Sequence, residues 1–478
     1  MNHRSSGLSA WQLTMLALGT VVGGSFFLGS AIAIKAAGPA IFISYVIGGI
    51  LVYIILSALS EMTVANPHTG SFRTHAEQAF GPWLGFIVGW VYWTGLVLAM
   101  SSEATAASVF IRAWIPQLSL PVLAIAIVVS VTSLNLLGAK TLSQLESGLA
   151  AIKLAALVGF VGIAAALIVG LFPGKLPVGL GAITQEPLLP NGIGGVAGSM
   201  LIVLFSYAGF EIIGLAASEV KNPHKVIPKA IIYTVIGLAG LYIAVMFTLL
   251  PLVPTAGLTE SVSPLVAALN AVGLGVAAGS INIVLVTAIL STMLAATFGL
   301  GRMVRSLADT GNAPAFLIDK GDVPYRGILF SGASMLGGVS LSFFLPKSIY
   351  IFLVSSGGFS LLFAYIIIML THYKFRAKNG CPPIGHCQLV GFPYTAWAAI
   401  AGLVIVTVTM PLIPGQGSGL FAGLVFLAFY AVSYLIFKAL PEGIGLKDMV
   451  SAKPLVTDRD PDRSDAAEAS SQINADKQ

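Results

Sequence analysis

The stretch Gly19-Thr20-Val21-Val22-Gly23-Gly24-Ser25 lies in the middle of the first apolar run of the chain, near residues 12–34. A run of about 20 apolar residues predicts a helix that crosses a membrane, but glycines and other small residues in its centre favour an unwound segment. Unwinding frees backbone N–H and C=O groups that lipid cannot bind. We therefore expect this stretch to face protein, water or a polar ligand, and we treat it as a candidate binding site.

The composition of the whole chain predicts a protein that spans the membrane many times. Of its 478 residues, 56% are hydrophobic and 9% are charged, whereas about a quarter of the residues of a soluble domain are charged. The first run is too long for the apolar part of a secretory signal peptide, and further runs follow it. Twelve apolar runs are candidate spans, near residues 12–34, 40–64, 85–111, 120–138, 147–171, 196–216, 228–253, 279–303, 327–345, 349–371, 394–411 and 418–438.

The positive charges indicate how the chain is oriented. If both termini and the even-numbered loops are cytoplasmic, all but five of the 24 Lys and Arg residues are inside, as the positive-inside rule requires. The exceptions are Lys35, Arg112, Lys175 and Lys347 in outer loops and Lys153 within a span. The net charge of +5 therefore reflects membrane orientation, and we expect no nucleic acid partner.

A second interruption is predicted in the sixth run, where Phe205-Ser206-Tyr207-Ala208-Gly209-Phe210-Glu211 places a glycine and a carboxylate in an apolar context. Interrupted helices at matching positions of two halves are typical of transporters built from inverted repeats, which bind their substrate near the midplane. We assign a first repeat to residues 12–171, a second repeat to 196–371 and two extra helices to 394–438. The alternative for Gly19 and Gly23 is close helix packing through small residues, but the paired breaks and Glu211 favour a site.

The chemistry of two broken helices suits one class of ligand. N–H groups at the start of a half-helix attract a carboxylate, and C=O groups at the end of a half-helix attract an ammonium group. An α-amino acid carries both groups a few ångströms apart. The two breaks therefore predict an amino acid as the ligand.

Both ends of the chain are predicted to be cytoplasmic. Residues 1–11 form a short N-terminal segment, and residues 441–478 are polar and charged, so we expect this tail to be disordered. Cys381 and Cys387 share a cytoplasmic loop with His372 and His386 nearby, which raises the alternative of a metal site. Because their spacing matches no zinc pattern and the compartment is reducing, we expect reduced thiols.

Short motifs follow one another from about Trp11 to Leu440. They include Ala17-Leu18-Gly19, Ala37-Gly38-Pro39, Leu59-Ser60-Glu61-Met62, Gly81-Pro82-Trp83, Gly89-Trp90-Val91-Tyr92-Trp93, Gly209-Phe210-Glu211-Ile212-Ile213-Gly214 and Ala217-Ser218-Glu219-Val220-Lys221-Asn222-Pro223. With these motifs the chain resembles bacterial amino acid permeases of the amino acid-polyamine-organocation (APC) superfamily, in the amino acid transporter branch. The resemblance implies an all-α fold of LeuT type, with five plus five inverted spans and two extra helices. It also implies sodium-independent, often proton-coupled uptake of amino acids.

The resemblance further implies a set of substrate-binding residues, namely Val21, Gly23, Gly24, Ser25, Phe205, Ala208 and Glu211. The substrate carboxylate is expected on the N–H groups of residues 23–25. The ammonium group is expected on the C=O groups of Val21 and Phe205. Glu211 is expected to help hold the ammonium group and the unwound backbone, or to carry the proton.

Two departures from the family pattern bear on the substrate. Ser25 stands where relatives commonly have the last glycine of Gly-Thr-Gly, and Leu294 and Ala295 stand where the eighth span usually has an Asn and a Ser. Two polar groups near the pocket are therefore absent from the expected positions. This favours a substrate with a neutral or apolar side chain.

Three further titratable residues lie in or near the predicted spans. Lys153 costs about 2.5 to 3.5 kcal/mol at a helix centre, and the resemblance implies that it couples transport to protons, in the place where sodium-coupled relatives bind sodium. The alternative is a side chain that extends to the cytoplasmic edge. Glu61 is expected at the cytoplasmic boundary as a structural or gating contact. Glu103, toward the outer part of the third span, is expected either to pack against other helices or to line the vestibule.

These observations predict a secondary active transporter in the cell membrane that imports an amino acid by proton symport with alternating access. An exchanger of amino acids or amines is the alternative, and a sensor that binds without transport is a third reading. No catalytic or phosphate-binding pattern appears in the spans, so we expect no enzyme activity, no cofactor and no metal. The expected partners are the substrate, protons and the lipid bilayer.

Overall fold

The structure is a computed structural model. It describes residues 9–66, 71–211, 213, 220, 222–319, 321, 323–344, 349–381 and 387–439. The predicted disorder of residues 441–478 and most of the predicted segment 1–11 lie outside the described residues, as does most of the motif 217–223.

The described chain is built from helices joined by short connections. These helices are α1 (Ala10–Val21), α2 (Gly24–Phe27), α3 (Gly29–Ala37), α4 (Ile41–Ala65), α5 (Ser71–Phe80), α6 (Pro82–Ile111), α7 (Leu120–Asn135), α8 (Ala139–Val169), α9 (Gly192–Ser206), α11 (Pro223–Leu249), α12 (Pro264–Ala271), α13 (Gly275–Asp309), α14 (Tyr325–Ser340), α15 (Ile349–Asn379), α16 (Tyr394–Thr409) and α17 (Gln416–Ala439).

Eight helical stretches of the described residues are long and apolar enough to cross a membrane. They are Gly29–Ala65, Pro82–Ile111, Gly148–Val169, Pro223–Leu249, Gly275–Asp309, Ile349–Asn379, Tyr394–Leu412 and Gln416–Lys438. Shorter apolar helices are Ala10–Val21, Leu120–Asn135 and Gly192–Ser206. The described part of the chain is therefore all-helical, and the protein is a polytopic membrane protein, as its composition predicts.

The first predicted interruption is present between α1 and α2. Ser9 begins α1 with a capping box, in which its hydroxyl accepts a hydrogen bond from the Gln12 N–H and the Gln12 side chain binds the Ser9 N–H. The helix ends at Val21, and the backbone of Val22 and Gly23 is extended. The chain becomes helical again at Gly24. The small residues of this stretch thus unwind the helix where the sequence predicts.

The second predicted interruption follows α9. This helix ends at Ser206, and residues 207–211 form turns. Gly209 has φ +106°, a backbone conformation that glycine adopts without the steric cost other residues meet. A side chain at this position would also approach the Thr20 carbonyl, because an ideal Cβ would lie 3.2 Å from that oxygen. The glycine therefore allows the two interruptions to lie against each other.

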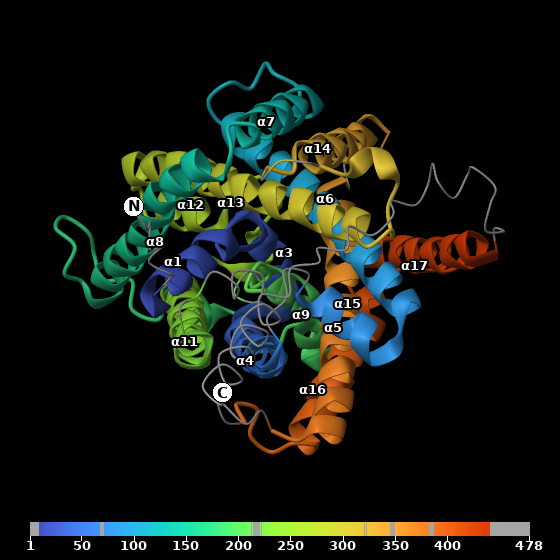
Figure 1. Ribbon diagram of the computed structural model, residues 1–478. Coiled ribbons are helices and arrows are strands. Elements are labelled where there is room, and N and C mark those ends of the chain that lie inside the picture. The colour runs from blue at the N-terminus through green and yellow to red at the C-terminus, as the bar shows by residue number, and fades with distance from the viewer. Residues whose placement is uncertain are drawn as a thin grey trace, which may run out of the picture.

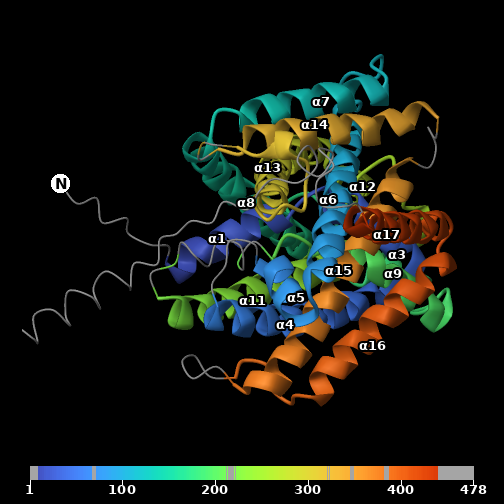
Figure 2. The same cartoon turned by 45° about the vertical axis from the view of Figure 1, so that its right-hand side comes forward.

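The helices pack in a single bundle with the first interruption inside it. In Figure 1, α7 and α14 lie at the top and α16 at the bottom, with α1 and α3 between them. Turning the molecule shows α7 beside α14 and α4 beside α11 (Figure 2), pairs that are in contact. The helix α1 contacts α8, α11 and α13, and α3 contacts α9. Both interrupted segments are therefore surrounded by other helices.

The cysteine pair differs from the sequence expectation of reduced thiols. Cys381 and Cys387 form a disulfide, with their Cα atoms 5.3 Å apart. The expectation rested on the reducing compartment, but the two cysteines lie within the usual Cα separation for a disulfide. The expectation of reduced thiols is therefore wrong for this structure.

Candidate functional site

The start of α2, directly after the first break, presents backbone N–H groups to a buried carboxylate. The N–H of Gly24 donates to Oε2 of Glu103 at 2.6 Å, and the N–H of Ser25 donates to Oε1 at 3.0 Å. Sequence reasoning assigned these two N–H groups to the carboxylate of the substrate. In this structure a carboxylate does bind them, and it belongs to the protein itself.

Glu103 reaches this place from the middle of α6, and its side chain is 3% exposed. The glycines opposite it make the approach possible. An ideal Cβ on Gly24 would lie 2.8 Å from Oε2 of Glu103, and one on Gly23 would lie 3.1 Å from the same atom. Of the two roles that the sequence suggested for Glu103, its burial between helices fits packing and not the lining of a vestibule. Its hydrogen bonds to the start of α2 add a role that the sequence did not suggest. The available signal was a carboxylate among the small residues Ser101, Ser102 and Ala104.

Lys153 lies on the other side of the same break. It comes from α8, its side chain is fully buried, and its ammonium group donates to the carbonyl oxygens of Gly19 and, at 3.1 Å, Val22. These are carbonyls at the end of α1. The alternative that Lys153 extends to the cytoplasmic edge is therefore wrong, because its charge is satisfied inside the bundle.

Thr292 of α13 completes the contacts to the carbonyl end of α1. Its hydroxyl lies 3.0 Å from the Val22 oxygen, and it also accepts from the Lys153 ammonium group at 3.2 Å. Sequence reasoning missed this residue because it looked for polar groups at positions 294 and 295. The eighth span thus does supply a polar group to the break, two to three residues closer to the start of that span.

The second break is held mainly by Glu211. Its Oε1 accepts from the Tyr92 hydroxyl at 2.7 Å, and its Oε2 accepts from the Gly209 N–H at 3.1 Å and from the Tyr365 hydroxyl at 3.4 Å. The carboxyl group thus ties the unwound backbone to α6 and α15. Among the described contacts it binds its own segment and two tyrosines, and it holds the backbone as expected.

Two contacts join the second break to the first. The Ser206 hydroxyl donates to the Ser25 carbonyl at 3.3 Å, and the Thr20 hydroxyl donates to the Gly209 carbonyl at 3.5 Å. The predicted C=O group of Phe205 accepts from the Ala208 N–H at 3.1 Å, so it has a backbone donor in this structure. The two interruptions form one continuous region of polar backbone inside the bundle.

Aromatic side chains pack beside this region. Phe26 stacks on Tyr242 with ring centroids 3.9 Å apart, and Tyr45 and Tyr207 pack around this pair. The Tyr350 hydroxyl donates to the Gly24 carbonyl at 3.3 Å. The surroundings of the break are therefore aromatic, with polar contacts directed at the backbone.

Glu61 lies near the C-terminal end of α4, where it contacts several other elements. Its carboxylate is 2.7 Å from Nε2 of His372 and 3.4 Å from the Arg376 guanidinium. It also accepts from the N–H groups of Gln388 and Leu389 at 2.6 and 2.7 Å. Glu61 therefore joins α4 to α15 and to the chain that follows it, and the structure gives it a connecting role.

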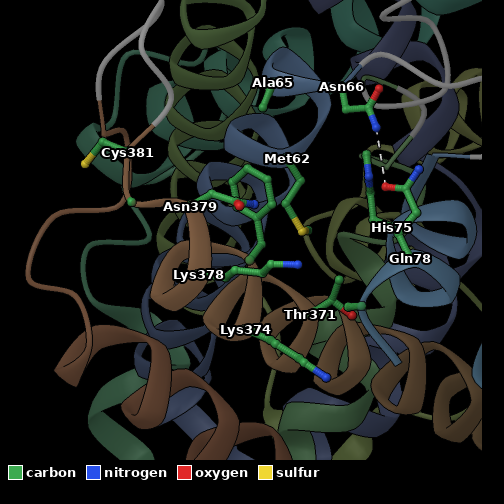
Figure 3. Close-up of a pocket in the computed structure, with 13 residues that line it drawn as sticks. Met62, Ala65, Asn66, His75, Gln78, Thr371, Lys374, Lys378, Asn379 and Cys381 are labelled. Carbon is green, nitrogen blue, oxygen red and sulfur yellow. Dashed lines mark hydrogen bonds between the residues drawn. The ribbon is translucent and has the colours of Figure 1, made fainter. Parts of the chain in front are cut away.

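A groove of about 470 Å³ opens beside this network, between α4, α5 and α15 (Figure 3). Its lining includes Asn66, His75, Thr371, Lys374 and Lys378. None of its lining residues belongs to α2 or to the second break. The groove is therefore separate from the site formed by the two interruptions.

Comparison with known proteins shows the family to which the chain belongs. A family model described as "Amino acid permease" matches residues 12–447. The chain is 30% identical to the gamma-aminobutyric acid permease of Bacillus subtilis, over 97% of this chain and 99% of the relative. It is 32% identical to the aromatic amino acid transport protein AroP of Escherichia coli, over 90% of this chain and 95% of the relative. It is also 32% identical to the L-asparagine permease of Streptomyces coelicolor, over 84% of each chain. The chain therefore belongs to the amino acid permease family of the APC superfamily, whose members are transporters and not enzymes.

Proposed function

We propose that this permease imports an amino acid across the cell membrane by proton symport with alternating access. The observation that carries the proposal is the pair of hydrogen bonds from the Gly24 and Ser25 N–H groups to a carboxylate. In this structure Glu103 supplies that carboxylate. Because the two N–H groups bind both oxygens of one carboxylate, they are suited to bind the carboxylate of a substrate. The predicted residues Gly23, Gly24 and Ser25 are thus the carboxylate half of the proposed site.

The ammonium half of the proposed site consists of Val21, Phe205, Ala208 and Glu211. Val21 and the second break are close, because an ideal Cβ on Gly209 would lie 3.5 Å from the Val21 Cα. Carbonyl groups and a carboxylate near one another favour a cation. A zwitterion that bridges the two breaks would therefore meet charges of the right sign at both of its ends.

The relatives support a substrate that is recognised through its carboxylate and its amine. Their names give γ-aminobutyric acid, asparagine and aromatic amino acids. These compounds have different side chains, or none, and share a carboxylate and an amine. The aromatic surroundings of the break in this chain favour a neutral or apolar side chain.

Contacts between helices support the proposed LeuT-type arrangement of five plus five inverted spans, followed by two extra helices within a twelve-span domain. If α1–α3, α4, α6 and α7 open the first repeat, their counterparts in the second are α9, α11, α13 and α14. All four counterpart pairs are in contact: α3 with α9, α4 with α11, α6 with α13 and α7 with α14. Two halves related by an axis in the membrane plane would make such contacts. The distribution of Lys and Arg supports cytoplasmic termini.

We propose that Lys153 belongs to the proton-coupling machinery. Its ammonium group binds carbonyl oxygens at the end of α1. The positive charge of the protonated lysine stabilises these carbonyls in the way that a bound metal cation would. Loss of that proton would leave the lysine without the charge that holds these carbonyls. The shape of the first break would then depend on protonation of Lys153.

Uptake by purified protein in proteoliposomes tests this proposal. We expect radiolabelled neutral amino acids to accumulate with an inward proton gradient and not with a sodium gradient. Replacing Lys153 with Ala should abolish gradient-driven uptake, whereas Lys438→Ala at the end of α17 serves as a lysine control and should transport normally.

Three results would contradict the proposal. They are accumulation that requires sodium, gradient-driven uptake that persists in Lys153→Ala, and binding of amino acids without any transport. Uptake that occurs only when substrate is present inside the liposomes would instead identify an exchanger.

A further inference from the structure

We propose that Glu103 and the substrate carboxylate bind the same two N–H groups in turn, and that Glu103 takes up a proton when it gives them up. This inference rests on the proposed function. Glu103 is then a second group, besides Lys153, that links proton binding to substrate binding. It takes up a proton because the substrate carboxylate displaces it from the two N–H groups.

The geometry makes the two carboxylates competitors. The N–H groups of Gly24 and Ser25 each donate to one oxygen of Glu103, at 2.6 and 3.0 Å. A second carboxylate on these N–H groups would bring two negative charges into contact in a buried place. Like charges at such a distance strongly disfavour ionisation of both groups. Glu103 must therefore leave the N–H groups, lose its charge, or do both when a substrate carboxylate arrives.

Few groups around Glu103 could stabilise its negative charge once it leaves the two N–H groups. The titratable groups that face it from other helices are Lys153 of α8, Tyr242 of α11 and Tyr350 of α15, and each interacts with it electrostatically. Among these only Lys153 is a cation, and its ammonium group binds the carbonyls of Gly19 and Val22. Away from the two N–H groups, an ionised Glu103 would be a buried charge without its two donors, which is strongly unfavourable.

The resulting step is balanced in charge and in atoms. One proton adds to the Glu103 carboxylate to give a neutral carboxylic acid, and the substrate carboxylate takes over the two N–H groups. No covalent bond other than the new O–H bond forms. If Lys153 keeps its proton in this step, each zwitterionic substrate enters the site together with one proton, a one-to-one ratio.

The substitution Glu103→Gln separates this proposal from a purely structural role. Glutamine is similar in shape but cannot take up a proton. With a pH indicator in weakly buffered detergent solution, we expect the wild type to take up a proton when substrate binds and the variant to take up none. In proteoliposomes the variant should retain substrate counterflow and lose accumulation driven by a proton gradient.

A second glutamate provides the matched control. Glu186 lies outside the break and binds the N–H and hydroxyl groups of Thr255. Glu186→Gln should therefore keep both proton uptake and gradient-driven accumulation. If Glu103→Gln does not bind substrate, Glu103→Asp replaces it, because a carboxyl group one methylene shorter still titrates and should still take up a proton on binding.

The outcomes distinguish this inference from the proposed function. Proton uptake on binding that persists in Glu103→Gln, or that is absent in a binding-competent Glu103→Asp, would overturn the role of Glu103. Either result would leave amino acid transport by the wild type untouched. Failure of the wild type to transport any amino acid would instead remove the proposed function.

The lining of the groove between α4, α5 and α15 supports a second proposal, independent of the first. We propose that this groove binds an anion that carries a phosphate group. Lys374 and Lys378 lie one turn apart on α15 and both line the groove, and Figure 3 shows the Lys378 amine pointing across it toward α5. Thr371 also lines the groove. Its side chain is buried, and its hydroxyl has no hydrogen-bond partner among the described residues.

The charge of the groove is uniform in sign. None of its described lining residues is Asp or Glu, and the neighbouring stretches 67–70 and 382–386, outside the described residues, contain neither in their sequence. The two lysines and the unpartnered Thr371 hydroxyl are donors suited to phosphate oxygens. The Lys374 amine also lies 4.6 Å from the centroid of the Phe80 ring, and the Asn66 amide already donates to the Gln78 side chain at 3.3 Å. Basic pockets between helices at the cytoplasmic side of a membrane protein bind anionic lipid head groups in the same way.

Thermal unfolding tests the groove and identifies the source of the phosphate. The wild type and the double variant Lys374→Gln, Lys378→Gln are compared in nanodiscs of phosphatidylcholine, with phosphatidylglycerol or with added inorganic phosphate. We expect a higher midpoint for the wild type with one of these two additions, and none of that shift in the double variant. Lys438→Gln is the control and should behave like the wild type.

The addition that raises the midpoint identifies the ligand. A shift with phosphatidylglycerol alone identifies a lipid head group, and a shift with inorganic phosphate identifies a soluble anion. Equal midpoints in all three conditions, or equal shifts in the wild type and the double variant, would overturn the groove as an anion site.

Discussion

At the scale of single residues, Gly24 has the most constrained position in the site. Its N–H binds Glu103, and an ideal Cβ there would lie 2.8 Å from Glu103 Oε2, 3.0 Å from the Ala106 Cβ and 3.2 Å from the Ile289 Cδ1. The methyl group of Gly24→Ala would thus push away any carboxylate on this N–H group. We expect the variant to bind substrate at least tenfold more weakly, a loss of about 1.4 kcal/mol, with the protein still folded.

Ser25→Gly is the neighbouring control for this prediction, since it removes a side chain and leaves both N–H groups in place. Isothermal titration with the preferred substrate measures both variants. Equal affinities for wild type and Gly24→Ala would show that the substrate carboxylate binds elsewhere. A broader substrate range in Ser25→Gly would show that Ser25 restricts the side chains that the site accepts.

At the scale of helices, the sequence predicts where the chain unwinds. Small residues in an apolar run allow a helix to unwind but do not require it, since Gly48 and Gly49 remain within α4 and Gly357 and Gly358 within α15. The paired positions of the two breaks and the carboxylate of Glu211 are what single out the ends of α1 and α9. The long helices extend past the predicted spans, as α15 does by continuing to Asn379, because polar residues at the membrane surface continue a helix that hydropathy alone would end.

The directions in which buried side chains point are much harder to predict. The helix α6 is apolar around most of its surface, so the sequence does not indicate which face carries Glu103 toward the first break. For Lys153 an inward and an outward orientation fit the same sequence, and only packing against α1 and α13 selects the inward one. Thr292 was missed for the same reason, since its partner is a backbone carbonyl far away in the sequence.

At the scale of the whole molecule, the proposed symport makes transport depend on the membrane potential. A zwitterion has no net charge, so the proton on Glu103 gives the loaded site one additional positive charge. Moving that charge through 100 mV is worth about 2.3 kcal/mol, which corresponds to roughly fiftyfold accumulation when each 1.4 kcal/mol is a factor of ten. We therefore expect a potassium diffusion potential, negative inside and without a pH gradient, to drive accumulation of this order in proteoliposomes.

Glu103→Gln separates this prediction from the alternatives. If the charge travels on Glu103, the variant should equilibrate substrate across the membrane and show no accumulation at any potential, while Glu186→Gln accumulates like the wild type. An exchanger of neutral amino acids would respond to internal substrate and not to the potential. Wild-type accumulation that is insensitive to potential would mean that no net charge moves with the substrate, and the two interruptions would then serve electroneutral transport.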